Sequence, residues 1–409
     1  MNVEPLQIQR MTKILAMETW LILALFARMF LLILGFKEIA SALFMLIHVL
    51  ALLIGVKYVV HVLAKGLKRE RFAPLVIFAI MALYIGAVYL VNRLRPVSLE
   101  ELPVTLLIVC LLIAALDGSI IYQTVFKFYF KCSIVASVVL IFAAFIPDFY
   151  KEGSLLLYTA NENQAGIIYM CMFMNMMVYL QLKKRFSLSY FLVILVSLGT
   201  FIGCCMTHSR TSIACCVLVV LVYLVFKHKS KPFSSIIIIL IMTMFVCLPF
   251  LVVYVLPRLG ININAITTGR DGIWLKVISE SFASPFKANF TDPIFPYSVT
   301  YGQQINAHNV LLELTWRYSM PIGVFFIIFM FLIISKTNKL VGRNRFSMML
   351  FATLIICLVH MCFEASLISG ALDFSLYIVL PLVMGYNFEL KSENKRRKNK
   401  IVLKEDSDE

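Results

Sequence analysis

Residues 257–274 read Pro-Arg-Leu-Gly-Ile-Asn-Ile-Asn-Ala-Ile-Thr-Thr-Gly-Arg-Asp-Gly-Ile-Trp, and the polar passage they open continues to His308. It interrupts a chain of 409 residues in which 61% are hydrophobic and only 14% are charged. Soluble proteins carry about 25% charged residues and about half apolar ones. Because apolar runs of about 20 residues, enough to cross a hydrocarbon core, recur on both sides of the passage, we expect a polytopic membrane protein. The predicted fold is all-α, with residues 257–308 as one long external loop.

The length and charge of the apolar runs predict about twelve transmembrane helices. We place them at residues 14–34, 39–63, 72–91, 102–121, 130–146, 164–182, 188–206, 212–226, 235–256, 320–334, 346–363 and 372–388.

Basic residues follow the even-numbered spans, which sets the predicted orientation. Connectors of this kind lie in the cytoplasm, so both termini are expected inside a cytoplasmic membrane. One basic connector, which contains Arg93 and Arg95, does not fit this scheme because it falls outside. Four polar stretches then face outward: residues 148–163, 208–210, 257–308 and 364–369.

The orientation divides the chain into four regions. They are the N-terminal helices (1–160), a core with the external loop (161–334), the C-terminal helices (335–390) and a charged cytoplasmic tail (391–409). The net charge of +15 comes largely from connectors and tail, which argues against a nucleic-acid partner.

The long loop is too rich in aromatic residues for a flexible linker. Its section 269–286 carries apolar residues spaced for one face of a helix, namely Ile273, Val277, Ile278 and Phe282. We expect a short amphipathic helix here that begins after Gly269 and lies at the membrane surface.

Two arginines near the outer ends of helices are candidate anion ligands. Arg210, in a turn between two spans, is either an interfacial anchor or a guanidinium that binds phosphate oxygens in a fork. Arg270 stands at the predicted start of the amphipathic helix, where free N–H groups already favour an anion. The alternative for Arg270 is a simple pair with its neighbour Asp271.

His308 is the candidate for proton transfer, because histidine exchanges a proton near neutral pH. The alternative is a structural histidine at a helix entry, where Asn309 would serve as the N-cap in either case. Supporting roles are expected for Asn309, Glu313, His360 and Glu364; His360 and Glu364 lie one turn apart near the outer end of a span. The sequence contains no phosphate-binding Gly-rich loop with its lysine and no His-Glu-x-x-His motif, so neither a metal nor another cofactor is expected.

Four short motifs occur in order between residues 161 and 314. They are Asn-Glu-Asn-Gln-Ala-Gly (161–166), Thr-His-Ser-Arg-Thr-Ser (207–212), Gly-Arg-Asp-Gly-Ile-Trp (269–274) and Ala-His-Asn-Val-Leu-Leu-Glu-Leu (307–314). With the long loop and the twelve spans, they resemble the O-antigen ligase and polymerase family of bacterial envelope glycosyltransferases. The resemblance covers roughly residues 160–330.

The resemblance implies sugar transfer from a polyprenyl diphosphate carrier to an acceptor hydroxyl on the outer face of the membrane, without a metal. Arg210 and Arg270 would bind the diphosphate, and His308 would contact or deprotonate the acceptor. A polymerase of lipid-linked repeat units, making an O-antigen or capsule, is favoured over a ligase that transfers the finished glycan to a lipid or protein. A flippase or chain-length regulator would be a partner. The remaining alternative is that this chain is itself a flippase, although it lacks the internal repeat that marks many transporters.

Overall fold

The computed structural model describes residues 5–43, 121–159, 162–227, 231–261, 270–289, 307–338 and 345–364, with isolated positions between 46 and 87 and Ile294. Most of the predicted spans 39–63, 72–91 and 102–121 lies outside the described residues. All of span 372–388 and the tail 391–409 lie outside them as well, as do parts of the long loop.

The described elements are almost all helical, which confirms the all-α prediction. The long helices are α1 (Pro5–Ile33), α5 (Ile121–Ala143), α6 (Glu162–Leu180), α7 (Leu188–Met206), α8 (Arg210–Lys227), α9 (Lys231–Phe250), α13 (Met320–Asn338) and α14 (Arg345–Phe363). The shorter ones are η1 (Pro147–Phe149), η2 (Leu251–Val255), η3 (Pro257–Leu259), α11 (Arg270–Ala283) and α12 (Val310–Tyr318). The described strands are β1 (Tyr150–Lys151) and β2 (Ser154–Leu155), which pair antiparallel.

The helix α6 forms the centre of the bundle. It packs against α5, α7, α8 and α14, and 14 of its 19 residues are buried. A helix that is apolar on all sides belongs in the interior, which explains this position. Gly166 permits a close approach to the turn before α8, because a Cβ there would lie 2.4 Å from Ser209 Cβ.

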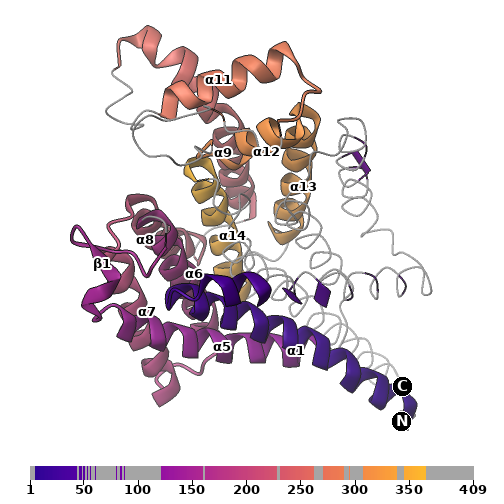
Figure 1. The fold of residues 1–409 in the computed structure, drawn as a ribbon, viewed down its shortest axis with the longest axis vertical. Helices are drawn as coiled ribbons and strands as arrows, with labels where there is room; N and C mark the ends of the chain where they lie inside the picture. The colour runs from indigo at the N-terminus through magenta and orange to yellow at the C-terminus, as the bar shows by residue number, and fades with distance from the viewer. Residues whose placement is uncertain are drawn as a thin grey trace, which may run out of the picture.

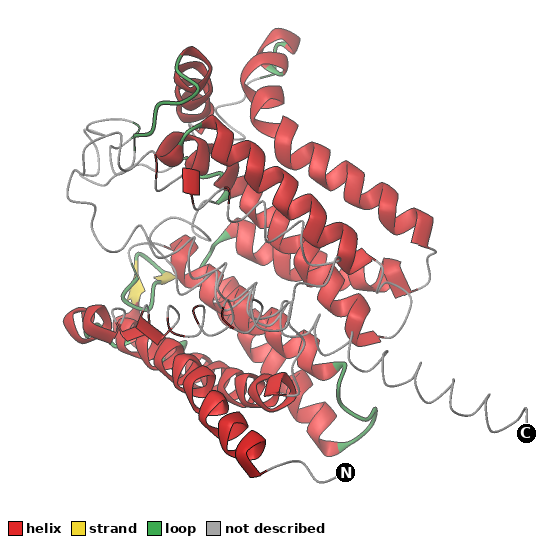
Figure 2. Ribbon diagram, turned by 90° about the vertical axis from the view of Figure 1, so that its right-hand side faces the viewer, coloured by secondary structure: helices red, strands yellow, loops and turns green. Residues whose placement is uncertain are grey.

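The helices α9, α13 and α14 stand beside one another, and α11 crosses above their ends together with α12 (Figure 1). Pro249 lies near the end of α9, where proline removes a backbone hydrogen bond, and the chain continues in the π-helical turn η2. This turn packs against α11. The side view also shows helix as the dominant structure, with the short strands at one edge (Figure 2).

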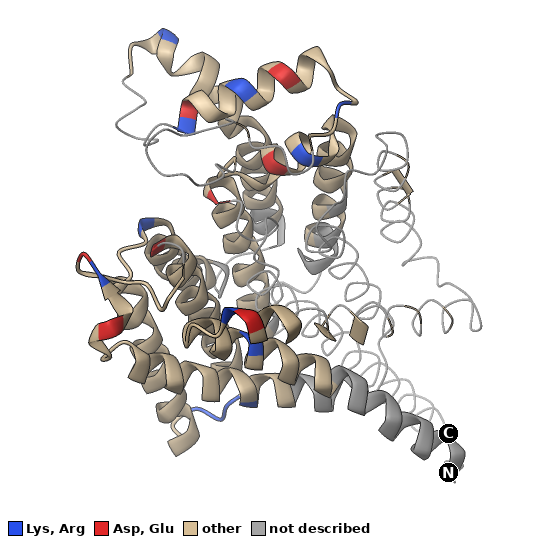
Figure 3. Cartoon of the chain, in the orientation of Figure 1, with Lys and Arg blue, Asp and Glu red and all other residues tan. Residues whose placement is uncertain are grey.

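Two described helical segments are long and apolar enough to cross a membrane, Leu188–Met206 and Ser235–Val255. The first coincides with the predicted span 188–206. Shorter apolar helices are Thr19–Ile33, Phe128–Ala143, Arg210–Val225, Met320–Leu332 and Met348–Phe363. Charged residues lie mainly on α11, on α12 and near helix ends, whereas the described parts of α9 and α13 show little charge (Figure 3).

The segment after His308 differs from the prediction. The chain first forms α12 and then breaks at Ser319, where φ is +92°, before α13 begins. The sequence predicts a helix entry at Asn309 and a span from residue 320, but not a separate short helix between them. Helix α5 likewise begins earlier than predicted, at Ile121 instead of residue 130.

Candidate functional site

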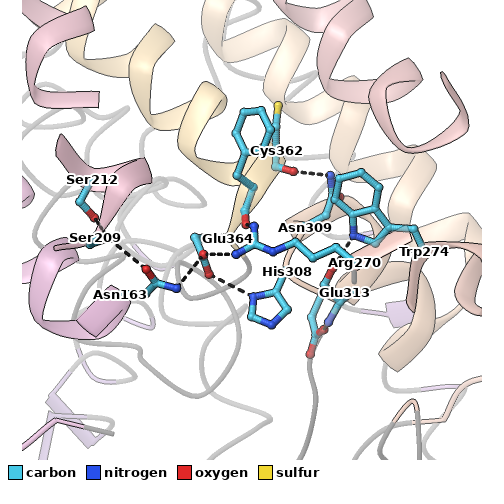
Figure 4. Close-up of polar contacts among 12 residues, drawn as sticks. Asn163, Ser209, Ser212, Arg270, Trp274, His308, Asn309, Glu313, Cys362 and Glu364 are labelled. Carbon is cyan, nitrogen blue, oxygen red and sulfur yellow. Dashed lines mark hydrogen bonds and ion pairs between the residues drawn. The ribbon is translucent and has the colours of Figure 1, made fainter. Parts of the chain in front are cut away.

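Glu364 forms the centre of a polar network just beyond the end of α14. Its side chain is only 4% exposed. Oε1 accepts hydrogen bonds from Arg270 Nη2 at 2.8 Å and from Asn163 Nδ2 at 3.1 Å. Oε2 lies 3.3 Å from His308 Nδ1 (Figure 4). One buried carboxylate therefore joins residues from the start of α6, the start of α11 and the end of the long loop.

Arg270 reaches this carboxylate because α11 is fixed along its apolar face. Trp274, Val277 and Ile278 are buried against the turn η2 and α12. Of the face predicted from the sequence, Val277 and Ile278 are buried, whereas Ile273 is partly buried and Phe282 is exposed. The predicted helix is therefore confirmed, its buried face packs on protein, and its place at the membrane surface stays a prediction. Arg270 Nη1 also donates to the carbonyl of Phe363, so the guanidinium holds the end of α14 at two points.

His308 adopts a backbone conformation that few residues other than glycine tolerate. Its φ is +47°, in the left-handed region. Asn309 follows it as the predicted N-cap of α12, accepting the Leu312 N–H at 3.0 Å. The Asn309 amide also donates to the Cys362 carbonyl at 3.0 Å. The imidazole remains 30% exposed, which leaves it accessible to a ligand.

The turn between α7 and α8 is connected to the same network. The Ser209 hydroxyl donates to Asn163 Oδ1 at 3.1 Å and also lies within hydrogen-bond distance of Ser212 Oγ, at 3.0 Å. Arg210 comes next as the first residue of α8 and is exposed. Its side chain forms no hydrogen bond or ion pair with the described part of the chain. The structure thus brings Arg270 and His308 onto one carboxylate, while Arg210 stands one residue from the network.

Glu313 lies on α12, the helix that follows His308, and is 2% exposed. Its Oε2 accepts the Ala307 N–H at 2.6 Å, and its Oε1 accepts Arg317 Nε at 2.5 Å. The Trp274 indole N–H donates to the Ala307 carbonyl at 2.7 Å. The residue before His308 is therefore held on both sides of its backbone.

His360 has a different environment from the other predicted site residues. It is fully buried in α14, one turn before Glu364. Neither ring nitrogen has a hydrogen-bond partner within the described residues, so His360 does not belong to the Glu364 network. Its supporting role stays a prediction.

The charge state of Glu364 follows from its neighbours. Burial alone would raise the pKa of this carboxyl, because desolvation disfavours the charged form. The hydrogen bond from His308 and the positive charge of Arg270 outweigh burial, and the pKa lies below the ordinary glutamate value. Glu364 is therefore a carboxylate at neutral pH, so His308 Nδ1 must carry the proton that points to it.

Residue-by-residue reasoning from the sequence did not identify Asn163, Ser209 or Trp274 as parts of the network. The signal was present, because each lies in one of the four motifs, and Asn163 and Ser209 are polar residues beside the start of a predicted span. Among the described residues, no group of three or more His, Cys, Asp or Glu side chains stands close enough to hold a metal ion.

Searches of protein-family models, of curated proteins and of solved structures found no match to this chain.

Proposed function

We propose that the protein is a membrane glycosyltransferase that polymerises lipid-linked oligosaccharide repeat units on the outer face of the cytoplasmic membrane. The main support for this proposal is the network around Glu364. It contains residues from all four polar stretches that the sequence predicts on the outer face. They contribute Asn163, Ser209, the pair Arg270 and His308, and Glu364 itself.

The supporting architecture is a membrane bundle of about twelve helices with both termini in the cytoplasm. Two described helical segments have the length and apolar character of spans. The outer surface of α7 adds support, since it exposes large apolar side chains that a lipid environment would cover. They are Leu188, Phe191, Leu192, Leu195, Leu198 and Ile202.

In the proposed reaction, His308 takes the proton of the acceptor hydroxyl. The hydroxyl oxygen bonds to the anomeric carbon of the donor, and the bond from that carbon to the phosphate oxygen breaks. Its electron pair leaves with the polyprenyl diphosphate. Glu364 stabilises the imidazolium that forms, as a carboxylate does for a catalytic histidine in other enzymes.

The diphosphate that leaves carries developing negative charge, which fixed cations stabilise. Arg210 is exposed beside the network, with its side-chain donors uncommitted within the described residues. Arg270 is already hydrogen-bonded to Glu364 and to the Phe363 carbonyl, and these contacts orient its remaining N–H groups. A guanidinium has five donors in a fixed plane, so Arg270 retains groups for a phosphate.

Deletion of the gene, followed by gel separation of the surface glycan, tests this function against its alternatives. A polymerase deletion leaves single repeat units attached to the anchor. Full-length chains retained on the carrier would instead identify a ligase, and repeat units retained on the inner leaflet would identify a flippase. A His308→Ala variant that accumulates normally must reproduce the deletion; a normal ladder of chain lengths would overturn the assignment of His308.

A further inference from the structure

We infer that Glu313 and Trp274 are positioning residues that hold His308 in its reactive orientation. They do so by hydrogen bonding to the peptide units on both sides of Ala307. This inference rests on the proposed function and adds residues whose only contact with the reaction is through the backbone before His308.

The first observation is the left-handed backbone of His308, with φ of +47°. Such a conformation is strained in a residue with a side chain and persists only where its surroundings impose it. Without that constraint, the His308 backbone would relax to a common conformation. The imidazole would then leave Glu364, because the direction of a side chain follows its backbone.

The second observation is the way in which Ala307 is held. Its N–H donates to Glu313 Oε2 at 2.6 Å, and its carbonyl accepts the Trp274 indole N–H at 2.7 Å. Ala307, Glu313 and Trp274 are all buried. Hydrogen bonds to a buried carboxylate are shorter and stronger than neutral ones, so this contact is well suited to holding strained backbone.

The third observation is that Glu313 is itself fixed. Its second oxygen accepts Arg317 Nε one helical turn later, so the carboxylate cannot rotate away from Ala307. Trp274 belongs to α11, the helix that also carries Arg270. The indole therefore links the positions of Arg270 and His308 through a path that does not include Glu364.

The test compares Glu313→Gln and Trp274→Phe in purified full-length protein reconstituted in lipid vesicles. A glutamine offers one acceptor oxygen in place of two, and phenylalanine keeps an aromatic ring but has no N–H to donate. The matched control is Glu280→Gln, the same change at an exposed carboxylate on α11 that pairs with Lys276. Size-exclusion chromatography selects the variants that fold.

With a polyprenyl diphosphate-linked oligosaccharide as donor, kcat should fall by about 10- to 100-fold in both variants, because misplacement of a reacting group by about 1 Å costs up to that much. The KM for the donor should stay unchanged, and Glu280→Gln should match the native protein. Because unfolded protein would also lower the apparent kcat without changing KM, kcat is calculated per folded molecule in the monodisperse fraction from size-exclusion chromatography.

A second readout does not depend on activity. In the native protein the His308 ring should be the tautomer protonated at Nδ1, as reported by 15N chemical shifts of histidine-labelled protein and assigned with His308→Ala. Glu313→Gln and Trp274→Phe should shift this signal toward a mixture of tautomers. Native kcat together with a native His308 signal in both variants would overturn the inference. A shifted signal in the variants, combined with a native protein that transfers no sugar, would support the positioning role and overturn the proposed function.

Discussion

The carboxylate of Glu364 holds Arg270 and Asn163 on one oxygen and faces His308 with the other. In Glu364→Gln, an NH2 group replaces one of the two oxygens. The side chain can then no longer accept hydrogen bonds at both positions. We expect the rate of sugar transfer to fall by about 100-fold, within the usual contribution of acid–base catalysis. The transfer rate is measured as radiolabelled sugar incorporated into polymer, with Glu280→Gln as the control. Transfer within twofold of the native rate would remove Glu364 from the mechanism.

The lowered pKa of Glu364 also predicts how stability changes with pH. In the pH window between its folded pKa and the ordinary glutamate value, the unfolded chain binds the extra proton and the folded chain does not. Stability from this group is therefore complete above the ordinary value and is lost as pH falls through the folded pKa. The native protein should lose Tm on acidification more steeply than Glu364→Gln, as measured by thermal unfolding in detergent. Parallel curves for the two proteins would contradict the pairing.

Arg210 provides a test of phosphate recognition, since its exposed guanidinium has no described partner to lose. Arg210→Lys keeps the charge but replaces the planar fork with a point charge. We expect donor affinity to fall by about tenfold, or roughly 1.4 kcal/mol, as the second hydrogen bond is lost. Arg258→Lys, a matched change at an exposed arginine in η3, should have no effect. Full activity in both Arg210→Lys and Arg270→Lys would disprove the diphosphate assignment.

At the scale of elements, the close contact between α6 and the start of α8 fixes the turn that carries Arg210. A Cβ on Gly166 would lie 2.4 Å from Ser209 Cβ, and neither backbone can give way easily in a buried bundle. Gly166→Ala should therefore destabilise the protein by about 1–3 kcal/mol, as overpacked cores do. Chemical denaturation measures the loss. Gly272→Ala is the control, because a Cβ in α11 at that exposed position meets nothing within 4 Å. Equal stability of the two variants would contradict this close packing.

The sequence predicts the helices better than their breaks. Helix α7 matches its predicted span because flanking polar residues end the apolar run on both sides, and Ser187 caps its start. Helix α11 follows from apolar spacing alone. The break at Ser319 was not predicted, since it depends on a positive φ at a serine and on the packing of α12.

The candidate site shows the same limit more strongly. Arg270 and His308 are identifiable because each stands at an expected helix start within the one long polar passage of an apolar chain. Their common partner Glu364 lies 94 residues from Arg270 and 201 residues from Asn163 along the chain. Periodicity and capping are local rules, so they identify the ends of helices without showing which ends meet.

At the scale of the whole molecule, the network gathers one end of each of several helices. Asn163 lies at the start of α6, Ser209 before α8 and Glu364 after α14. Hydrogen bonds among these three residues require the corresponding ends to lie on the same side of the bundle. Helices that cross a membrane in alternate directions would bring these ends to one side. Which side of the membrane that is depends on the charge of the connectors.

The charge of the connectors predicts which side of the membrane each one faces. The connector between α6 and α7 contains Lys183, Lys184 and Arg185, whereas the turn at Gly153 lies near the opposite end of α6. Because basic connectors stay in the cytoplasm, a protease site inserted after Gly153 should be cut in spheroplasts by added protease. A site inserted after Lys184 should be cut only once the membrane is permeabilised. Gly153 suits insertion, since a Cβ there meets nothing within 4 Å. The reverse pattern of cleavage would place the Glu364 network in the cytoplasm, where outer-leaflet sugar transfer cannot occur, and would overturn both the orientation and the reaction proposed for it.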